Sequence, residues 1–110
     1  MSTDRTTHIY RVDRFVVPAA AHPEFLDQVR STHQILRAQS GFVGDAVLEQ
    51  TSGPGKFNFV TLVEWESQSA IDAARAAIMA AHTQSGFNPQ EMFARLGIEA
   101  DIAYYQSIDA

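Results

Sequence analysis

The sequence predicts a single α+β domain whose elements follow in the order β-α-β-β-α-β. The chain has 110 residues, which leaves room for one hydrophobic core. Apolar residues make up 45% of it, so burial can drive folding. Stretches rich in β-branched and aromatic residues alternate with stretches whose apolar residues recur every three or four positions, which are the patterns of strands and helices.

The first strand is expected at residues 8–17, where β-branched and aromatic side chains are frequent and Pro18 ends the run. A helix follows, because Pro23 suits a first helical turn. Its apolar stripe consists of Leu26, Val29, His33 and Leu36. Gly41 is expected to cap this helix in the left-handed conformation.

Residues 42–51 and 57–66 read as two strands. The Ser, Gly and Pro residues of the connector 52–56 are typical of turns, so the pair is expected to form an antiparallel hairpin. Ser67 can cap a second helix. The apolar stripe of that helix consists of Ile71, Ala74, Ile78 and Ala81.

An extra short helix is predicted before the last strand, because Asn88 can cap it and Pro89 suits its first position. Gly97 ends this helix, and residues 98–108 form the last strand. The complete order is the split β-α-β, or ferredoxin-like, arrangement, with a four-stranded antiparallel sheet and helices on one of its faces.

The other face of the sheet is predicted to be too apolar to face water. In the second hairpin strand Val60 and Leu62 point to this face, and in the last strand Ala103 and Tyr105 do so. A half-exposed antiparallel sheet alternates more cleanly between apolar and polar residues. We therefore expect a second copy of the chain to cover this face in a two-fold homodimer.

The composition argues against several classes of protein. A net charge of -5 and eight scattered basic residues disfavour nucleic-acid binding. No apolar run approaches the roughly 20 residues of a membrane span, and without Cys there is no disulfide or thiolate chemistry. The histidines show no metal-binding spacing, so no metal site is expected. Residues 1–7 read as a disordered polar tail, residues 8–110 as one domain, and a cytoplasmic location is expected.

Two motifs resemble the antibiotic biosynthesis monooxygenase (ABM) family. They are GFV at residues 41–43 and FVTLVEWES at residues 59–67, which leads to Ala70 and Ile71. The typical pattern of that family is a Gly after the first helix and a strand that ends in Trp-Glu shortly before a helix. The likeness covers residues 10–82, and it implies a dimeric α/β barrel with an apolar pocket between sheet and helices.

The resemblance implies a cofactor-independent monooxygenase that acts on a small hydrophobic aromatic, polyketide-like or quinol substrate. Family members include oxygenases that use O₂ without metal or flavin, quinol oxidases and haem-degrading enzymes. In the cofactor-free reaction the substrate supplies the electrons, because its deprotonated anion can reduce O₂ directly. The protein then needs a dry pocket, a base, and donors that stabilise the anion.

The candidate catalytic residues lie on the apolar stripes of the two long helices. His33 is a candidate base, because imidazole titrates near neutral pH; the alternative is a histidine at the edge of the core bonded to a backbone carbonyl. His82 follows Ile78 by four residues and is the second candidate base. Arg75 shares the face of Ile71 and Ile78, where its guanidinium could stabilise negative charge.

The candidate substrate-binding residues are polar and aromatic side chains of the strands: Tyr10, Asp13, Arg14, Thr61, Trp65 and Tyr104. Trp65 is expected in the pocket wall or the core. Tyr10, Asp13, Arg14 and Tyr104 could converge from neighbouring strands, and the alternative is an Asp–Arg pair that holds the dimer together. Thr61 stands where cofactor-free oxygenases of the family can carry Asn.

Two other functions stay open. One is a dimeric ligand-binding or accessory domain without catalysis, which the replacement of the family's Asn by Thr61 and the absence of a Trp from the second helix favour. The other is haem degradation, because His82 matches the haem-ligand position of some family members when a short deletion is allowed. Those members also use an Asn in the first strand and a Trp in the second helix. This chain has Asp13 in the first strand instead of the Asn, and Ala73-Ala74 where the Trp should stand.

Overall fold

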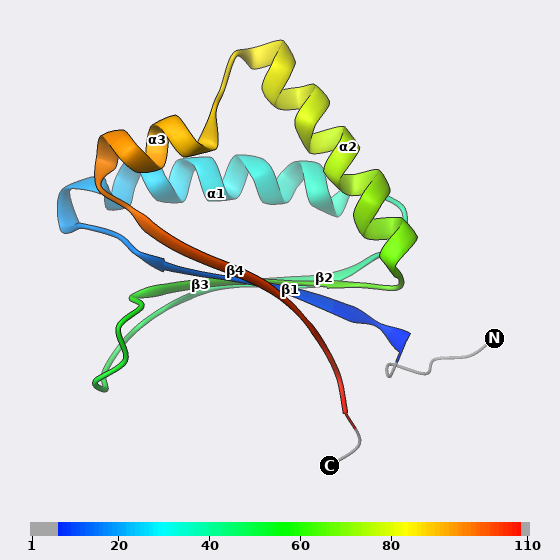
Figure 1. The fold of residues 1–110 in the computed structure, drawn as a ribbon, viewed down its shortest axis with the longest axis horizontal. Helices are drawn as coiled ribbons and strands as arrows, with labels where there is room; N and C mark the ends of the chain where they lie inside the picture. Colours follow the sequence, from blue (N-terminus) through cyan, green and yellow to red (C-terminus); the bar gives the residue numbers. More distant parts are fainter. Residues whose placement is uncertain (1–6, 109–110) are drawn as a thin grey trace.

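The computed structural model describes residues 7–108, and it has the predicted order of elements with an extra short helix before the last strand (Figure 1). The elements are β1 (Ile9–Val16), the short 3₁₀ turn η2 (Ala19–Ala21), α1 (His22–Arg37), β2 (Phe42–Glu49), β3 (Phe59–Trp65), α2 (Gln68–Ser85), α3 (Pro89–Leu96) and β4 (Glu99–Gln106). The four strands form one antiparallel sheet in the order β2-β3-β1-β4. This is the ferredoxin-like fold. The expected tail, apart from Thr7, lies outside the described residues.

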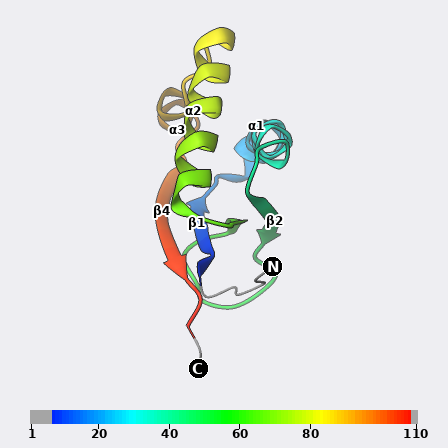
Figure 2. The same ribbon diagram turned by 90° about the vertical axis from the view of Figure 1, so that its right-hand side faces the viewer.

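All three helices lie on one face of the sheet (Figures 1 and 2). The core between the two layers has two parts. Near one end Phe15 of β1 packs edge-on against Phe25 of α1, with ring centroids 4.9 Å apart. Toward the other end Trp65 of β3 packs against Ile71 and Ala74 of α2. The core therefore ties each long helix to the central strands β1 and β3.

Side-chain caps define the starts of two helices, as predicted. The Ser67 hydroxyl accepts a hydrogen bond from the Ala70 amide at 3.2 Å at the start of α2. The Asn88 side chain does the same for the Glu91 amide, also at 3.2 Å, at the start of α3. Each bond satisfies one of the amides that a helix leaves unpaired at its first turn.

The prediction that Gly41 caps α1 is wrong. The helix ends at Arg37, and Ala38 follows it in a right-handed conformation. Gly41 does adopt a left-handed conformation, with φ of 84°, but it does so in the loop that enters β2. A Cβ atom at this position would lie 2.4 Å from the Cβ atom of Ala70, so the close approach of the loop to α2 also demands glycine.

The other face of the sheet carries no helix; its middle is apolar, and the ion pairs His8–Glu64 and Arg14–Asp101 lie on the same face. The strand register places Val12 of β1 beside Leu62 of β3, and Leu62 beside Ala46 of β2, all pointing away from the helices. Leu48 is 52% exposed and Tyr105 is 47% exposed. No helix in residues 7–108 has the length and hydrophobicity of a membrane span.

Candidate functional site

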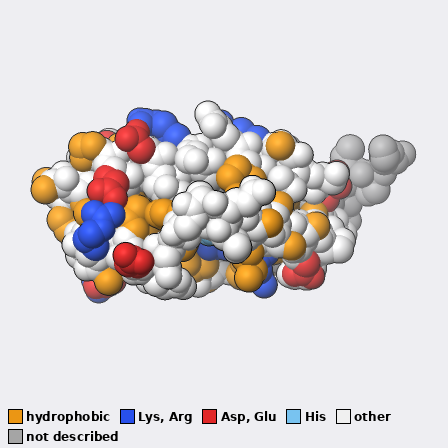
Figure 3. All heavy atoms as spheres, turned by 90° about the horizontal axis from the view of Figure 1, so that it is seen from above, with side chains coloured by type: hydrophobic (Ala, Val, Ile, Leu, Met, Phe, Trp, Pro, Cys, Tyr) orange, Lys and Arg blue, Asp and Glu red, His pale blue; other side chains and the backbone are white. Residues whose placement is uncertain are grey.

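A cavity of about 300 Å³ lies between the sheet and the three helices. Its walls are mostly apolar, and a small number of polar side chains reach into it from α1, α2, β1 and β3. Seen from the helix side, hydrophobic side chains come to the surface between scattered charged ones (Figure 3). A mostly apolar cavity with a few polar groups is the usual form of a small-molecule site, and this volume is at the lower end of the usual range.

His33 of α1 is buried and lines this cavity, and it pairs with Asp45 of β2, a half-buried residue that is not part of the cavity lining. The Nδ1 atom of His33 lies 2.9 Å from Oδ2 of Asp45, and Nε of Arg37 donates to the same oxygen at 2.8 Å. Burial raises the pKa of Asp45, but the hydrogen bonds and charges of His33 and Arg37 outweigh it, so that the pKa of this carboxyl lies below its ordinary value. Asp45 is therefore an ionised acceptor, and Nδ1 of His33 carries a proton.

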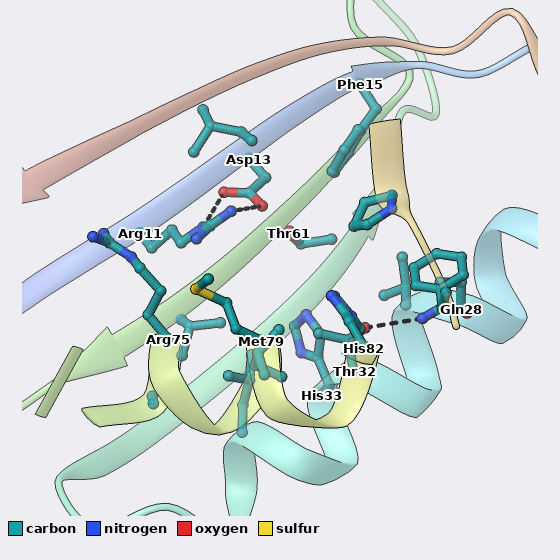
Figure 4. Close-up of a pocket in the computed structure, with 18 of the residues that line it drawn as sticks. Arg11, Asp13, Phe15, Gln28, Thr32, His33, Thr61, Arg75, Met79 and His82 are labelled. Atoms are coloured by element: carbon teal, nitrogen blue, oxygen red, sulfur yellow. Dashed lines mark hydrogen bonds and ion pairs between the residues drawn. The ribbon is translucent and has the colours of Figure 1, made fainter. Parts of the chain in front are cut away.

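The other ring nitrogen of His33 is left as the acceptor. In the neutral imidazole, a proton on Nδ1 leaves a lone pair on Nε2. The side chain is only 5% exposed, yet Nε2 has no hydrogen-bond partner among the described residues and is not sealed from solvent. Because His33 lines the cavity, this nitrogen can take a proton from a bound molecule (Figure 4).

Reasoning from the sequence placed His33 in the site but missed Asp45. The signal was a carboxylate in a strand of the hairpin, 12 residues beyond a histidine on the apolar stripe of a helix. Whether the two side chains meet depends on how α1 lies over β2, which no local pattern determines.

A second polar group lies at the β4 side of the cavity. Arg11 of β1 donates two hydrogen bonds to Asp13, from Nε to Oδ1 at 2.9 Å and from Nη2 to Oδ2 at 3.2 Å. Burial lowers the pKa of Arg11, but Asp13 and Tyr104 more than compensate and raise it above its ordinary value. Arg75 of α2 donates from Nη2 to the Tyr104 hydroxyl at 2.8 Å, and Arg11 approaches the same oxygen at 3.4 Å. Tyr104 is 40% exposed and lies at the rim rather than in the cavity wall.

Thr61 and Trp65 present two further polar groups on β3. Both residues are buried and both line the cavity. Neither the Thr61 hydroxyl nor the Trp65 indole N–H has a hydrogen-bond partner in residues 7–108, and neither atom is sealed from solvent. Both groups are therefore available to a bound molecule.

His82 also lines the cavity, from the last turns of α2. Its ring packs edge-on against Phe87, with centroids 5.1 Å apart. Ala73 is exposed, and the side chain of Ala74 is buried in the core, so neither supplies an aromatic ring at the cavity. Within the described part of the chain, no group of three or more His, Cys, Asp or Glu residues could hold a metal ion.

The expected convergence of Tyr10, Asp13, Arg14 and Tyr104 is wrong. Alternate residues of a strand point to opposite faces, so Asp13 faces the helices while Tyr10 and Arg14 face away from them. Arg14 forms an ion pair with Asp101 on that open face, and Asp13 pairs with Arg11 instead. Six predicted site residues do line the cavity, and their roles stay predictions: Asp13, His33, Thr61, Trp65, Arg75 and His82.

Comparisons with known proteins agree with this architecture. The model of the family described as antibiotic biosynthesis monooxygenase matches residues 9–86. No curated protein matches the sequence.

Several solved structures have the same fold. SnoaB, a cofactor-independent oxygenase from Streptomyces nogalater, is 18% identical, with 94% of this chain and 96% of that chain covered and a TM-score of 0.66. MhuD, a haem degrader from Mycobacterium tuberculosis with two haems in its active site, is 22% identical, with coverage of 93% and 97% and a TM-score of 0.67. A conserved protein from Methanosarcina mazei Go1 is 19% identical, with coverage of 94% and 97% and a TM-score of 0.64. At these identities the likeness shows a shared fold.

Proposed function

Because the chain belongs to the antibiotic biosynthesis monooxygenase family, we propose that it is a cofactor-independent monooxygenase acting on a small hydrophobic aromatic, polyketide-like or quinol substrate. The observation that carries this proposal is the His33–Asp45 pair, which presents an acceptor nitrogen to an otherwise mostly apolar cavity. A base in a dry pocket is what O₂ chemistry without a cofactor requires from a protein.

The first step is proton transfer from a phenolic hydroxyl of the substrate to Nε2 of His33. Asp45 keeps the imidazole in the required tautomer and stabilises the imidazolium that forms. His82, in the same cavity, is the second candidate for the base. The resulting phenolate is electron-rich and can pass an electron to O₂.

The remaining steps balance without an external reductant. The substrate radical and the reduced O₂ combine into a hydroperoxide at a ring carbon. Loss of water then leaves a quinone, so that one oxygen atom enters the product and the other leaves as water. All electrons come from the substrate, and the ring hydrogen and the phenolic proton end in the water.

Other cavity residues would bind and orient the substrate. Trp65 offers an indole edge and face, and the Thr61 hydroxyl offers a donor to the anion. Arg75 supplies positive charge at the cavity wall for an anionic group of the substrate. A volume of about 300 Å³ suits a ligand of a few fused rings.

A non-catalytic ligand-binding domain is the alternative function, and the replacement of the family's Asn by Thr61 favours it. The open cavity, with a histidine that is oriented by a carboxylate, favours the enzyme. Haem degradation fits the residues poorly. His82 could serve as a ligand, but Ala73 and Ala74 provide no ring in the second helix and Asp13 is already held by Arg11.

We further propose that the working molecule is a homodimer formed through the open face of the sheet. Val12, Val60 and Leu62 lie on this face, and Leu48 and Tyr105 extend it toward both edges. A second copy would remove this apolar surface from water, and a two-fold arrangement would bring the same patch of each copy together.

Isotope labelling tests the proposed reaction. The protein, dialysed against a chelator, is supplied with ¹⁸O₂ and a dihydroxynaphthalene, and the product is analysed by mass spectrometry. A monooxygenase places one ¹⁸O atom in the quinone. Oxidation of the substrate with no ¹⁸O in the product would point to a quinol oxidase. Binding of phenols without any turnover, across a panel of them, would favour the non-catalytic domain.

A further inference from the structure

Arg75 differs from the other basic residues that the structure describes. Arg11, Arg14, Arg30, Arg37, Lys56 and Arg95 each form an ion pair with a carboxylate. The chain has 13 acidic and eight basic residues, so carboxylates are in excess. Arg75 nevertheless has no carboxylate partner in residues 7–108, and its Nη2 atom instead binds the neutral hydroxyl of Tyr104. A guanidinium left without a counter-charge at a cavity wall can accept an anionic group of a ligand.

Arg75 and Tyr104 together form a site for such a group. The Tyr104 oxygen accepts from Arg75 at 2.8 Å and from Arg11 at 3.4 Å, so the phenolic proton is directed elsewhere and can be donated. Arg11 itself is neutralised by Asp13. An anion beside Arg75 would therefore meet one uncompensated positive charge and one hydroxyl donor.

This site and the candidate base lie on the same face of the sheet but near its opposite edges. His33 is anchored to Asp45 on β2, and Arg75 is anchored to Tyr104 on β4. These are the two edge strands of the sheet. Three inter-strand spacings of roughly 4.8 Å separate β2 from β4, which is about 14 Å. In Figure 4 Arg75 likewise lies on the side of Arg11, apart from His33. Asp45 and Tyr104, which anchor the two groups, thus lie on strands three spacings apart, and this favours a ligand longer than a single aromatic ring.

The β4 side is also where the cavity opens. Met79 and Ile102 line the cavity there and are 62% and 46% exposed, and Arg75 is exposed as well. A permanent charge can bind at this mouth without losing all of its hydration, whereas the aromatic rings enter the apolar interior.

We propose that the substrate is an elongated aromatic of two or three fused rings with a carboxylate at one end, bound by Arg75 and Tyr104, and a phenolic hydroxyl at the other, which faces His33. This inference rests on the proposed function and narrows its substrate class. Arg75 thus binds the carboxylate of the substrate, and His33 and Thr61 stabilise the phenolate that forms during the reaction.

A matched pair of ligands tests the carboxylate directly. Calorimetry under argon compares 6-hydroxy-2-naphthoate with 6-hydroxy-2-naphthamide, which has the same shape without the charge. The wild-type protein should bind the carboxylate at least about tenfold more tightly than the amide. Equal affinities in the wild-type protein would overturn the proposal.

Two variants assign the preference to the residue. Arg75→Gln should remove the preference for the carboxylate while the affinity for the amide stays within about twofold. Arg30→Gln removes an arginine from the outer side of α1, where it pairs with the exposed Asp27, and should keep the preference intact. A preference that survives in Arg75→Gln would overturn the proposal. Thermal unfolding of both variants shows whether the fold is retained, and Tyr104→Phe, which should weaken the preference in part, provides a second readout.

The outcomes separate this inference from the proposed function. A protein that prefers the carboxylate but consumes no O₂ would keep the anion site and lose the oxygenase. A protein that turns over neutral and anionic phenols equally well would keep the oxygenase and lose the anion site.

Discussion

The Nδ1 atom of His33 lies 2.9 Å from a carboxylate oxygen of Asp45, a contact that joins helix α1 to the edge strand β2. The carboxylate turns a buried histidine into a directed acceptor, because it fixes the proton on one ring nitrogen and leaves the other as an acceptor in a side chain that lines the cavity. The same oxygen is held by Arg37, so the pair is anchored on the side away from the cavity.

Asp45→Asn should lower the rate of substrate-dependent O₂ consumption by about a hundredfold or more. The Asn amide can donate a hydrogen bond to Nδ1, which stabilises the tautomer that carries the proton on Nε2 and so blocks the base. Initial rates over a range of substrate concentrations measure the effect, which should appear in kcat. Asp27→Asn, which removes an exposed carboxylate of α1, is the matched control. An unchanged kcat in Asp45→Asn would rule out this role.

The stability of the protein should depend on Asp45 in acid. The pKa of this carboxyl is lowered in the folded state from an ordinary value near 3.8. The unfolded state therefore binds a proton more readily, so the contribution of Asp45 to stability is complete above that ordinary value and is lost as the pH falls through the folded value. Urea unfolding from about pH 5 to about pH 3 should show the difference between wild type and Asp45→Asn shrinking. A difference that stays constant over this range would contradict the lowered pKa.

Gly41→Ala should destabilise the protein by about 1–3 kcal/mol. The substitution places a side chain at a φ of 84° and pushes its Cβ to within 2.4 Å of Ala70, at the first turn of α2. Gly55→Ala in the hairpin loop is the control, since its Cβ would meet the nearest atom at 3.5 Å without a left-handed φ. Equal unfolding free energies for the two variants would show that the loop can move away from α2.

Leu62→Glu should convert the proposed homodimer into a monomer. The side chain points to the open face of the sheet from a central strand, and a carboxylate there would have to be buried at the interface. Light scattering at micromolar concentration should give twice the mass of one chain for wild type and the mass of one chain for the variant. Met79→Glu adds the same charge on the helix side and should stay dimeric. A wild-type protein with the mass of a single chain would defeat the dimer.

Local signals in the sequence were sufficient for the elements and most of the helix ends. Ser67 and Asn88 cap helices because their side chains bond amides three residues away, and Gly97 adopts the expected left-handed conformation. These interactions are complete within a few residues, so a sequence can reveal them. The role of Gly41 was assigned wrongly because its decisive contact is with Ala70, which is distant in sequence.

The site was predictable only in part for a related reason. His33 and Arg75 could be placed because the periodicity of a helix shows which face is buried. Arg14 was misplaced although the two-residue period of a strand assigns it to the face opposite Asp13. Asp45 was missed because its partner is chosen by the packing of α1 over β2, and that relationship is not encoded in any local pattern.

The measurement that tests the central claim most directly is O₂ consumption by chelator-treated protein with hydroxynaphthoate and dihydroxynaphthalene substrates, for wild type, His33→Ala and His82→Ala. We expect turnover by the wild type, a loss of about a hundredfold or more in His33→Ala, and a smaller effect in His82→Ala. No turnover by the wild type, or turnover that neither substitution affects, would contradict the account.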